Sequence, residues 1–480
     1  MSEEASIAAD AGALLEEGLR NLWYPIAPSW QVGENPLGVT RLGERIVVWR
    51  DRDGAVHALE DRCPHRGARL SLGWNLGDRL ACWYHGVEID PSGTVLDVPA
   101  VESCPLTGKA AVRRYPCREV RGAIFAWFGD ALHAEPAALD LPEQLTDERF
   151  ATMLCVAVWR CNYRYAIDNV MDPMHGAYLH ARSHSMASGN RRARLRVVPT
   201  DTGFLCEKED QRNVNFDWVE FGASGGHWMR LEIPYGKEAG PGGPFGIVGF
   251  VTPVDRETCQ VFFWRVRAVA GWQRDLWRFL YRMRLESLHW DVLEQDRLVL
   301  EAMAGDARES EFLYQHDTGL ARVRRFLAKE AERQATALAG DAAPAATGTA
   351  TATDRGRRPD SEARTADGPQ LAPRKERFHP RPNGELEFNP WLAEPRGSKG
   401  DAGTVEDFAE PLLYRWQHRA RAPNDFETSL ADALTATFAA EVHDRPGIVA
   451  RLNESDVANP GGGPWTEDAF GSALRELASP

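Results

Sequence analysis

The sequence predicts an α+β protein that begins with a short helix over residues 1–20. Short apolar runs separated by turn signals fill residues 21–135 and are typical of a small all-β domain. Residues 136–336 contain strand-like runs and close on a long stretch of helical periodicity, which predicts a mixed α+β domain. Residues 337–405 open with a run of Ala, Thr, Gly and Pro and are expected to form a largely disordered linker. Helical periodicity returns in a small module over 406–480.

The all-β prediction rests on three hairpin signals in the first domain. Each signal is a pair of short runs rich in β-branched and aromatic residues on either side of a turn. The pairs are RIVVW (45–49) with AVHALE (55–60), WYHGVEID (83–90) with TVLDVP (94–99), and AVRRYPC (111–117) with AIFAWF (123–128).

The second domain mixes the periods of strands and helices. The runs IVGFVTPV (247–254) and CQVFFWRVRAV (259–269) flank the turn DRET and predict a long hairpin. From Trp272 to Met303, apolar residues recur at spacings of three and four, which predicts one amphipathic helix or two in succession. A sheet packed on a long C-terminal helix is an α+β arrangement.

Composition and charge exclude several classes of protein. The chain has 480 residues, 43% of them hydrophobic, and a net charge of −14 with no concentrated basic block, which argues against a nucleic-acid partner. No stretch reaches the ~18 consecutive apolar residues of a membrane span, and acids stand near the N-terminus where a signal peptide has Lys or Arg. Eight cysteines are too sparse for a disulfide scaffold. We therefore expect a cytoplasmic protein with reduced thiols and no membrane association.

The strongest chemical signal is a pair of motifs, Cys63-Pro-His65 and Cys82-Trp-Tyr-His85. Two Cys and two His suit either one tetrahedral zinc ion or a [2Fe–2S] cluster with the thiolates on one iron and the imidazoles on the other. Zinc patterns usually pair like ligands within each loop, whereas here each loop carries one of each kind. The alternation favours the cluster, with Cys63 and Cys82 on one iron and His65 and His85 on the other.

The segments CPHRGARLSLGW (63–74) and CWYHG (82–86) resemble the Rieske [2Fe–2S] domain. Their glycines fit loops in which the backbone must approach a cluster closely. The sequence departs from the family at Val87, where Trp is usual. We expect this difference to alter packing near the cluster and not its ligation.

A second group of metal-binding residue types lies in NVMDPMHGAYLH, residues 169–180. Non-haem Fe(II) oxygenases bind iron through two histidines and one carboxylate. His175 and His180 are five residues apart and would point about 140° apart on an ideal helix. Both reach one metal only if the helix is distorted or ends near His180, and Pro173 and Gly176 favour such a break.

Together the two motifs resemble the catalytic (alpha) subunit of Rieske non-haem iron oxygenases of the ring-hydroxylating and demethylating kind, over about residues 20–330. The resemblance implies a helix-grip-like catalytic domain in which His175 and His180 bind a mononuclear Fe(II). It implies that Asp172 is not a ligand but a catalytic bridge. Its hydrogen bonds would join His175 to the Rieske histidine His85 of the neighbouring subunit in a head-to-tail homotrimer.

The third iron ligand is expected on the long helix, which offers Asp291, Glu294, Asp296 and Glu301. The segment EQDRLVLEA (294–302) resembles the acidic stretch that supplies this ligand in the family. The resemblance therefore points to Asp296.

The same resemblance implies an oxidoreductase, the terminal oxygenase of a multicomponent system. It would use O2 and electrons from NAD(P)H, through a separate reductase or ferredoxin, to hydroxylate, dihydroxylate or demethylate an aromatic or other cyclic hydrophobic substrate. An apolar pocket is expected from strand residues such as Phe245, Ile247, Phe262 and Trp264. The alternative is a Rieske electron-transfer or binding protein whose second metal site is inactive.

The tail RLNESDVANPGGGPWTEDAFGSALREL (451–477) resembles a small helical module of serine recombinases. The segment is not basic and has no arginine-rich helix, so we do not expect it to bind DNA. A docking or assembly role is the prediction.

Overall fold

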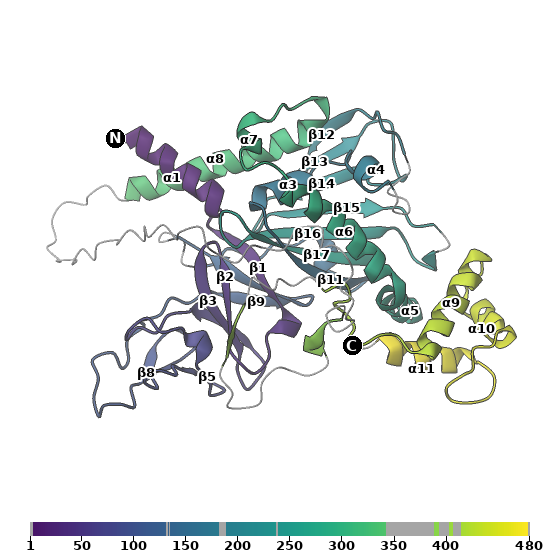
Figure 1. Cartoon of the computed structure of the whole chain (residues 1–480), viewed down its shortest axis with the longest axis horizontal. Coiled ribbons are helices and arrows are strands. Elements are labelled where there is room, and N and C mark those ends of the chain that lie inside the picture. Colours follow the sequence, from purple (N-terminus) through teal and green to yellow (C-terminus); the bar gives the residue numbers. More distant parts are fainter. Residues whose placement is uncertain are drawn as a thin grey trace, which may run out of the picture.

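The structure is a computed structural model that describes residues 3–130, 133, 135–181, 189–236, 239–341, 388–392, 403–406 and 414–478. Figure 1 shows the small strands of the first domain at the lower left, a larger sheet with its helices above them, and the C-terminal helices in yellow at the lower right. This α+β arrangement confirms the predicted fold class. Among the described residues, no helix is both long and apolar enough to cross a bilayer.

The first domain consists of three small sheets, in the orders β1-β10-β9, β18-β2-β3-β4 and β5-β6-β7-β8. The first two predicted hairpins are confirmed as the β3–β4 and β7–β8 pairs. The first strand of the third hairpin was predicted too early in the chain, because the turn at Arg121 and Gly122 pairs the residues directly beside it. The strands are β1 (Leu22–Pro28), β2 (Leu37–Arg41), β3 (Glu44–Arg50), β4 (Val56–Glu60), β5 (Trp74–Asn75), β6 (Leu80–Ala81), β7 (Glu88–Ile89), β8 (Val95–Asp97), β9 (Cys117–Val120), β10 (Ala123–Phe128) and β18 (Thr404–Val405).

The second domain is built on a seven-stranded antiparallel sheet in the order β11-β17-β16-β15-β14-β13-β12. The predicted long hairpin is confirmed as β16 and β17. The strands are β11 (Phe150–Trp159), β12 (Leu195–Pro199), β13 (Gly203–Lys208), β14 (Trp218–Gly222), β15 (Trp228–Ile233), β16 (Phe245–Pro253) and β17 (Cys259–Ala268).

The long amphipathic segment forms one continuous helical stretch whose middle turn is a π-helix, Tyr281–Leu285. It separates α5 (Trp272–Leu280) from α6 (Glu286–Glu301), so the prediction of one helix or two was right in position. The N-terminal helix packs along the helix that ends the second domain (Figure 1). The other helices are α1 (Glu3–Glu17), α2 (Glu143–Thr146), α3 (Tyr163–Val170), α4 (Gly176–Leu179), α7 (Ala307–Ser310) and α8 (Thr318–Asp341).

The two faces of the large sheet pack against different parts of the chain. Phe245, Ile247 and Phe263 lie on the inner face, in the core shared with α6. Phe262 and Trp264 lie on the outer face and pack against aromatic residues of the first domain. The predicted pocket is therefore wrong for Phe262 and Trp264, because alternate strand residues point to opposite faces of a sheet.

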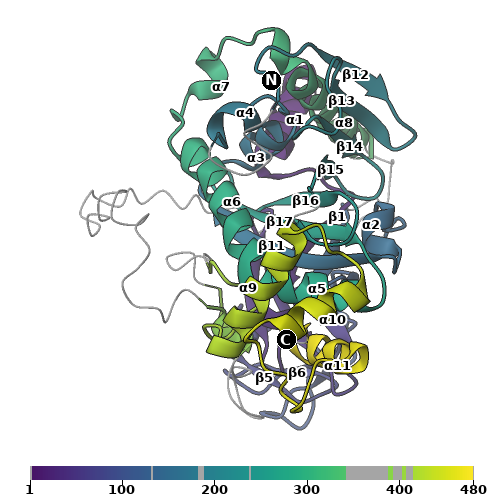
Figure 2. The same cartoon turned by 90° about the vertical axis from the view of Figure 1, so that its right-hand side faces the viewer.

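The C-terminal helices are α9 (Asp425–Ala439), α10 (Arg445–Glu454) and α11 (Glu467–Ala478). They share a hydrophobic core with α5 and the π-helix, and Figure 2 shows them lying in front of α5. The helical periodicity at 407–416 does not form a helix in its described part, 414–416, and its other residues lie outside the described ranges. Most of the predicted linker lies outside them as well.

Candidate metal centres

The two Cys–His motifs form loops of matching geometry. In the first loop the amide of Gly67 donates to the carbonyl of Cys63, and the amide of Cys63 donates to Ala68. In the second loop Gly86 donates to Cys82 in the same way, and Cys82 donates to Val87. Gly67 and Gly86 have φ of 76° and 73°, a conformation that L-residues with side chains rarely adopt. The repeated turn projects one thiol and one imidazole from each loop.

The four side chains of these loops converge in like pairs. A hydrogen bond between the two buried thiols lowers the pKa of Cys82 to about 6 and raises that of Cys63, which shows that the sulfur atoms are neighbours. The rings of His65 and His85 lie 4.7 Å apart, edge to face. Thiols on the inside and imidazoles toward the surface form a donor set that fits a [2Fe–2S] cluster with its histidine-bound iron outermost.

The second group of candidate ligands sits where the helix breaks. Helix α3 ends at Val170, and α4 is a single turn of which His175 and His180 are the flanking cap residues. The break around Pro173 brings together two histidines that a straight helix would point apart. This is the distortion that the spacing of five residues required.

His175, His180 and Asp296 converge on one point. Nε2 of His175 lies 3.5 Å and Nε2 of His180 lies 3.2 Å from Oδ1 of Asp296. One donor atom from each of the three residues lies within 4.8 Å of the others. Asp296 comes from α6, so the site joins two segments that are far apart in the sequence.

The remaining acids of α6 are engaged elsewhere. Asp291 pairs with Arg415 at 3.0 Å. Glu294 and Glu301 both pair with Arg297, and Glu301 also accepts the amide of Arg160. Of the four acids that the sequence offered, Asp296 is the one that faces the two histidines.

Hydrogen bonds at the Nδ1 atoms of His175 and His180 orient both rings so that their Nε2 atoms point toward Asp296. Nδ1 of His175 donates to the carbonyl of Asp172 at 2.6 Å, and Nδ1 of His180 bonds Oε1 of Gln295 at 2.8 Å. A neutral ring that donates from Nδ1 presents an unprotonated Nε2. Oδ1 of Asp296 is buried and has no hydrogen-bond partner. Two imidazole nitrogens and a carboxylate oxygen at these distances form a donor set that fits a divalent metal.

Family models match the two domains separately. A Rieske [2Fe-2S] domain matches residues 22–116, and a vanillate O-demethylase oxygenase C-terminal domain matches 159–333. The chain combines a Rieske domain with a Rieske oxygenase catalytic domain. Rieske domains bind a [2Fe–2S] cluster, and these catalytic domains bind a mononuclear iron. A recombinase-like helix-turn-helix domain matches 371–479.

Individual relatives support this assignment over part of the chain. A vanillate O-demethylase oxygenase subunit of Pseudomonas sp. strain HR199 is 37% identical over 164 residues, which are 34% of this chain and 46% of the relative. The oxygenase component of dicamba O-demethylase of Stenotrophomonas maltophilia is 34% identical over 183 residues, 38% of this chain and 53% of the relative. The chain thus matches about half the length of these relatives.

Solved structures share the Rieske oxygenase fold. The oxygenase in an oxygenase–ferredoxin complex of carbazole 1,9a-dioxygenase has a TM-score of 0.58 at 20% identity, covering 71% of this chain and 98% of that chain. Dicamba monooxygenase bound to dicamba has a TM-score of 0.54 at 24% identity, covering 66% and 98%. At these identities the likeness concerns the fold.

Within this Rieske oxygenase fold, Asp172 differs in one contact from the expectation. The histidine His175 bonds the main-chain carbonyl of Asp172, whereas the expected partner was its carboxylate. The carboxylate instead accepts the amide of Met174 at 2.7 Å. Asp172 is half-buried. Sequence reasoning also missed Gln295, because a glutamine beside an acid on a helix carries no distinctive spacing.

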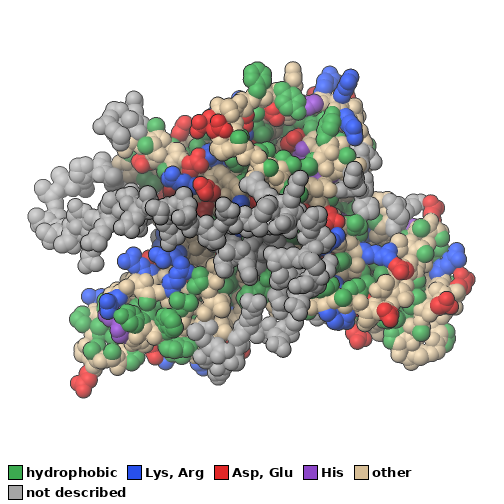
Figure 3. Space-filling view, in the orientation of Figure 1, with side chains coloured by type: hydrophobic (Ala, Val, Ile, Leu, Met, Phe, Trp, Pro, Cys, Tyr) green, Lys and Arg blue, Asp and Glu red, His purple; other side chains and the backbone are tan. Residues whose placement is uncertain are grey.

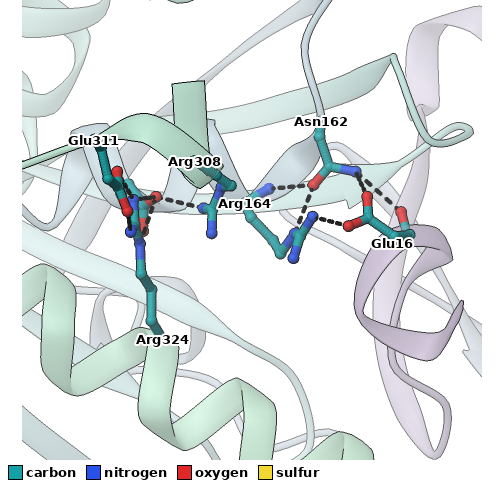
Figure 4. Close-up of polar contacts among 7 residues, drawn as sticks. Glu16, Asn162, Arg164, Arg308, Glu311 and Arg324 are labelled. Carbon is teal, nitrogen blue, oxygen red and sulfur yellow. Dashed lines mark hydrogen bonds and ion pairs between the residues drawn. The ribbon is translucent and has the colours of Figure 1, made fainter. Parts of the chain in front are cut away.

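Polar networks hold helix α3 at both of its ends. At the start, Asn162 caps the helix by accepting the amide of Arg164, and its Nδ2 donates to the carbonyl of Glu16 at 3.0 Å. Arg164 also pairs with the carboxylate of Glu16, as Figure 4 shows. Helix α1 is thereby fastened to the segment that carries the metal-site histidines.

The second network lies one turn before the break. Buried Asp168 accepts from Arg308 and from Arg324, whose Nη2 lies 2.8 Å away. Arg324 also pairs with Glu311, which is labelled with Arg308 and Arg324 in Figure 4. Helices α7 and α8 are thus tied to α3, so the position of the metal-site histidines depends on several distant segments.

Two exposed apolar patches accompany the two centres. The Rieske patch surrounds the cluster loops, and in Figure 3 green side chains gather around a purple histidine at the lower left. Its members include Leu76, Trp83, Tyr84, Leu96 and Val101. The catalytic patch lies beside Asp172, whose charge acts on Tyr314, and it includes Tyr178, Val299, Met303, Phe312, Leu313 and Tyr314.

Proposed function

We propose that this chain is the terminal oxygenase component of a multicomponent Rieske oxygenase. The observation that carries the proposal is the convergence of donor atoms from His175, His180 and Asp296, in a chain that also carries a Rieske domain. A Rieske electron carrier needs no second metal site. The intact geometry of the second site therefore argues against the alternative of an electron carrier with an inactive second site. The proposed cluster ligands are Cys63, His65, Cys82 and His85.

The residues of the second site act by holding three donors and leaving the other positions open. Asp172 and Gln295 fix the two rings through Nδ1, so that both Nε2 atoms remain turned toward Asp296. When bound, the [2Fe–2S] cluster supplies single electrons and the mononuclear iron activates O2. Three protein ligands leave room for O2 and for the substrate.

The proposed substrate is an aromatic or other cyclic hydrophobic compound, and the reaction is hydroxylation, dihydroxylation or demethylation. Relatives named for vanillate, toluene-4-sulfonate, dicamba and carbazole support this substrate class. Several relatives are named as components of larger systems, and a solved relative is an oxygenase–ferredoxin complex. The proposed electron source is therefore NAD(P)H, through a separate reductase or ferredoxin.

We further propose that the active assembly is a head-to-tail homotrimer in which the Rieske patch of one subunit covers the catalytic patch of the next. Within one chain the loops of β5–β8 and the helix α4 lie at opposite ends of the molecule (Figure 1). Apolar side chains left exposed in groups are typical of protein interfaces. Trp83 is 53% exposed and Phe312 is 96% exposed, and both would be covered. Asp172 beside the catalytic patch would then bridge His175 to His85 of the next subunit.

The proposed location is the cytoplasm, with neither membrane nor nucleic acid as a partner. None of the eight cysteines forms a disulfide, which agrees with a reducing compartment. Acidic side chains outnumber basic ones in α9–α11, and this balance opposes binding to phosphates despite the helix-turn-helix match.

The test is to measure iron and acid-labile sulfide per chain in anaerobically purified protein. We expect about three irons and two sulfides for the parent, and loss of about one iron without loss of sulfide in His175→Ala. Reduced protein should then consume O2 in the presence of a substrate. Two irons in both proteins would leave only the cluster and would make the electron-carrier alternative correct.

A further inference from the structure

Two buried arginines lie side by side on the inner face of β17. In the sheet register, Arg265 lies opposite Ile247 of β16 and Met153 of β11, both of which belong to the core beneath α6. Arg267 lies on the same face two residues later. Arg265 is 3% exposed and Arg267 is 2% exposed. A buried cation is costly unless it is paired or fully hydrogen-bonded.

Arg267 meets this requirement through main-chain carbonyls. Its guanidinium donates to Gly243 at 3.0 Å, to Ala239 at 3.1 Å and to Gly240 at 3.2 Å. It also lies over the ring of Tyr235. Arg267 therefore fastens the loop that precedes β16, and its role is structural.

Arg265 does not meet the requirement. Its Nε has no hydrogen-bond partner, and Nη1 reaches the carbonyl of Phe263 at 3.4 Å. Its guanidinium lies over the ring of Phe263, 5.6 Å from the centroid, and this contact supplies no acceptor. It makes no ion pair with any residue that the structure describes. Glu286 and Glu294 are acids of the same region, since both act electrostatically on the Cys155 thiol, as Arg265 does. Each already has another partner: Glu286 accepts from His418, and Glu294 pairs with Arg297.

The surroundings of Arg265 are aromatic. The rings of Tyr235 and Phe245 stack 5.1 Å apart, and His289 of α6 stacks on Phe245 at 4.3 Å. Burial raises the pKa of Tyr235 and of Tyr281, and the charge of Arg265 opposes the rise in both, so its guanidinium lies near both phenols. His289 precedes Asp296 by seven residues, about 10 Å along the helix. The stacked rings therefore lie about two helical turns from the residue that completes the metal site, and Arg265 lies near the same rings.

We infer that Arg265 determines specificity by pairing with a carboxylate group of the substrate, whose ring packs among the aromatic side chains between β17 and α6. Arginine binds carboxylates through two parallel hydrogen bonds, and this pairing would use the Nε donor that has no partner in the free protein. The inference rests on the proposed function, since it takes this layer as the place where the substrate is held. Among the aromatic compounds that such an enzyme could oxidise, Arg265 would favour those that carry a carboxylate.

The experiment uses the metal-loaded full chain with two probes, benzoate and its neutral counterpart benzamide. Binding is measured by calorimetry in the parent, in Arg265→Met, in Arg265→Lys and in the control Arg267→Met. The unfolding midpoint of each protein is measured without ligand. We expect the parent to bind benzoate about tenfold or more tightly than benzamide, because a charged hydrogen-bonded pair is formed only with the acid.

Arg265→Met should lose this preference while its midpoint without ligand stays equal to that of the parent or rises, because an unpaired buried charge has been removed. Arg265→Lys should retain part of the preference. Arg267→Met should unfold at a lower temperature and keep the preference.

The inference would be overturned if the parent did not prefer benzoate, or if Arg265→Met still preferred it. It would also be overturned if Arg265→Met lost as much thermal stability as Arg267→Met, since Arg265 would then be structural. These results are independent of turnover. A parent with both metals that oxidises a neutral substrate without preferring benzoate would refute this inference alone, and a parent without the second iron would refute the proposed function.

Discussion

The substitution Gln295→Leu tests how the metal site is held together. Gln295 accepts the Nδ1 proton of His180 at 2.8 Å, and the His180 side chain is 1% exposed. Leucine has a similar volume but offers no acceptor. Water cannot replace the glutamine at a ring so deeply buried, so Nδ1–H would lose its hydrogen bond. The ring would then turn, or its proton would move to Nε2 and occupy the position that a metal needs.

The size of the effect follows from that burial. An unsatisfied buried donor costs about 1–3 kcal/mol, which corresponds to roughly 5- to 150-fold in an equilibrium constant. Residues that orient metal-bound histidines typically change metal affinity by about 10- to 100-fold. Both arguments give the same range, so we expect Gln295→Leu to bind the mononuclear iron one to two orders of magnitude more weakly.

The assay is Fe(II) binding to protein whose second site has been emptied by a chelator, with the sulfide content measured alongside. Sulfide should be the same in the parent and the variant, because the Rieske loops lie in the other domain. The matched control is Gln295→Glu, which keeps an acceptor at this position and should bind iron at least as tightly as the parent. Parent-like affinity in Gln295→Leu would refute the reasoning.

Three further predictions concern other parts of the molecule. Burial lowers the pKa of His227 to about 4. Between pH 7 and pH 5 the unfolded state takes up a proton that the folded state does not bind, so the free energy of unfolding should fall by about 2 kcal/mol. Urea titrations of His227→Phe, whose ring would lie between Phe221 and Phe326, should show no such fall. Leu434→Ala removes a fully buried side chain of the C-terminal core and should lower the free energy of unfolding by about 2–5 kcal/mol in the same titrations. A decrease below about 0.5 kcal/mol would show that α9 does not pack on this core. Asp172→Asn should keep iron and sulfide but lose most turnover in an O2-uptake assay, and parent-like turnover would exclude the bridging role.

Much of the metal chemistry could be predicted from local spacing. Cys63, His65, Cys82 and His85 are close in sequence, and the turns that join them are set by glycines, so the loops follow from local structure. The break between α3 and α4 could also be inferred, since two histidines five residues apart serve one metal only on an interrupted helix. Spacing alone could not select Asp296 among four acids, because helix orientation decides which acid faces the histidines. The family resemblance pointed to Asp296, and the structure places it with the two histidines.

The substrate-binding residues could not be predicted in the same way. Phe262, Phe263 and Trp264 are consecutive aromatic residues of a strand that is buried on both faces, so hydrophobicity does not reveal which side each one faces. The unpaired state of Arg265 is equally invisible in the sequence. It depends on which carboxylates of distant segments are already engaged, and those contacts are long-range.

The C-terminal extension contacts the strand and the helix that support the metal site, although it is far from them in the sequence. The side-chain amide of Gln417 bonds both the amide and the carbonyl of Val156 and so completes the open edge of β11 as a neighbouring strand would. The main-chain amide of Gln417 and the ring of His418 both bond Glu286, the first residue of α6. Since α6 also carries Asp296, the extension fixes the start of the helix whose later turns complete the metal site. The match to a recombinase-like helix-turn-helix domain therefore says little about its role here, because its helices pack on α5 and the π-helix. Its connecting segment fastens the catalytic sheet.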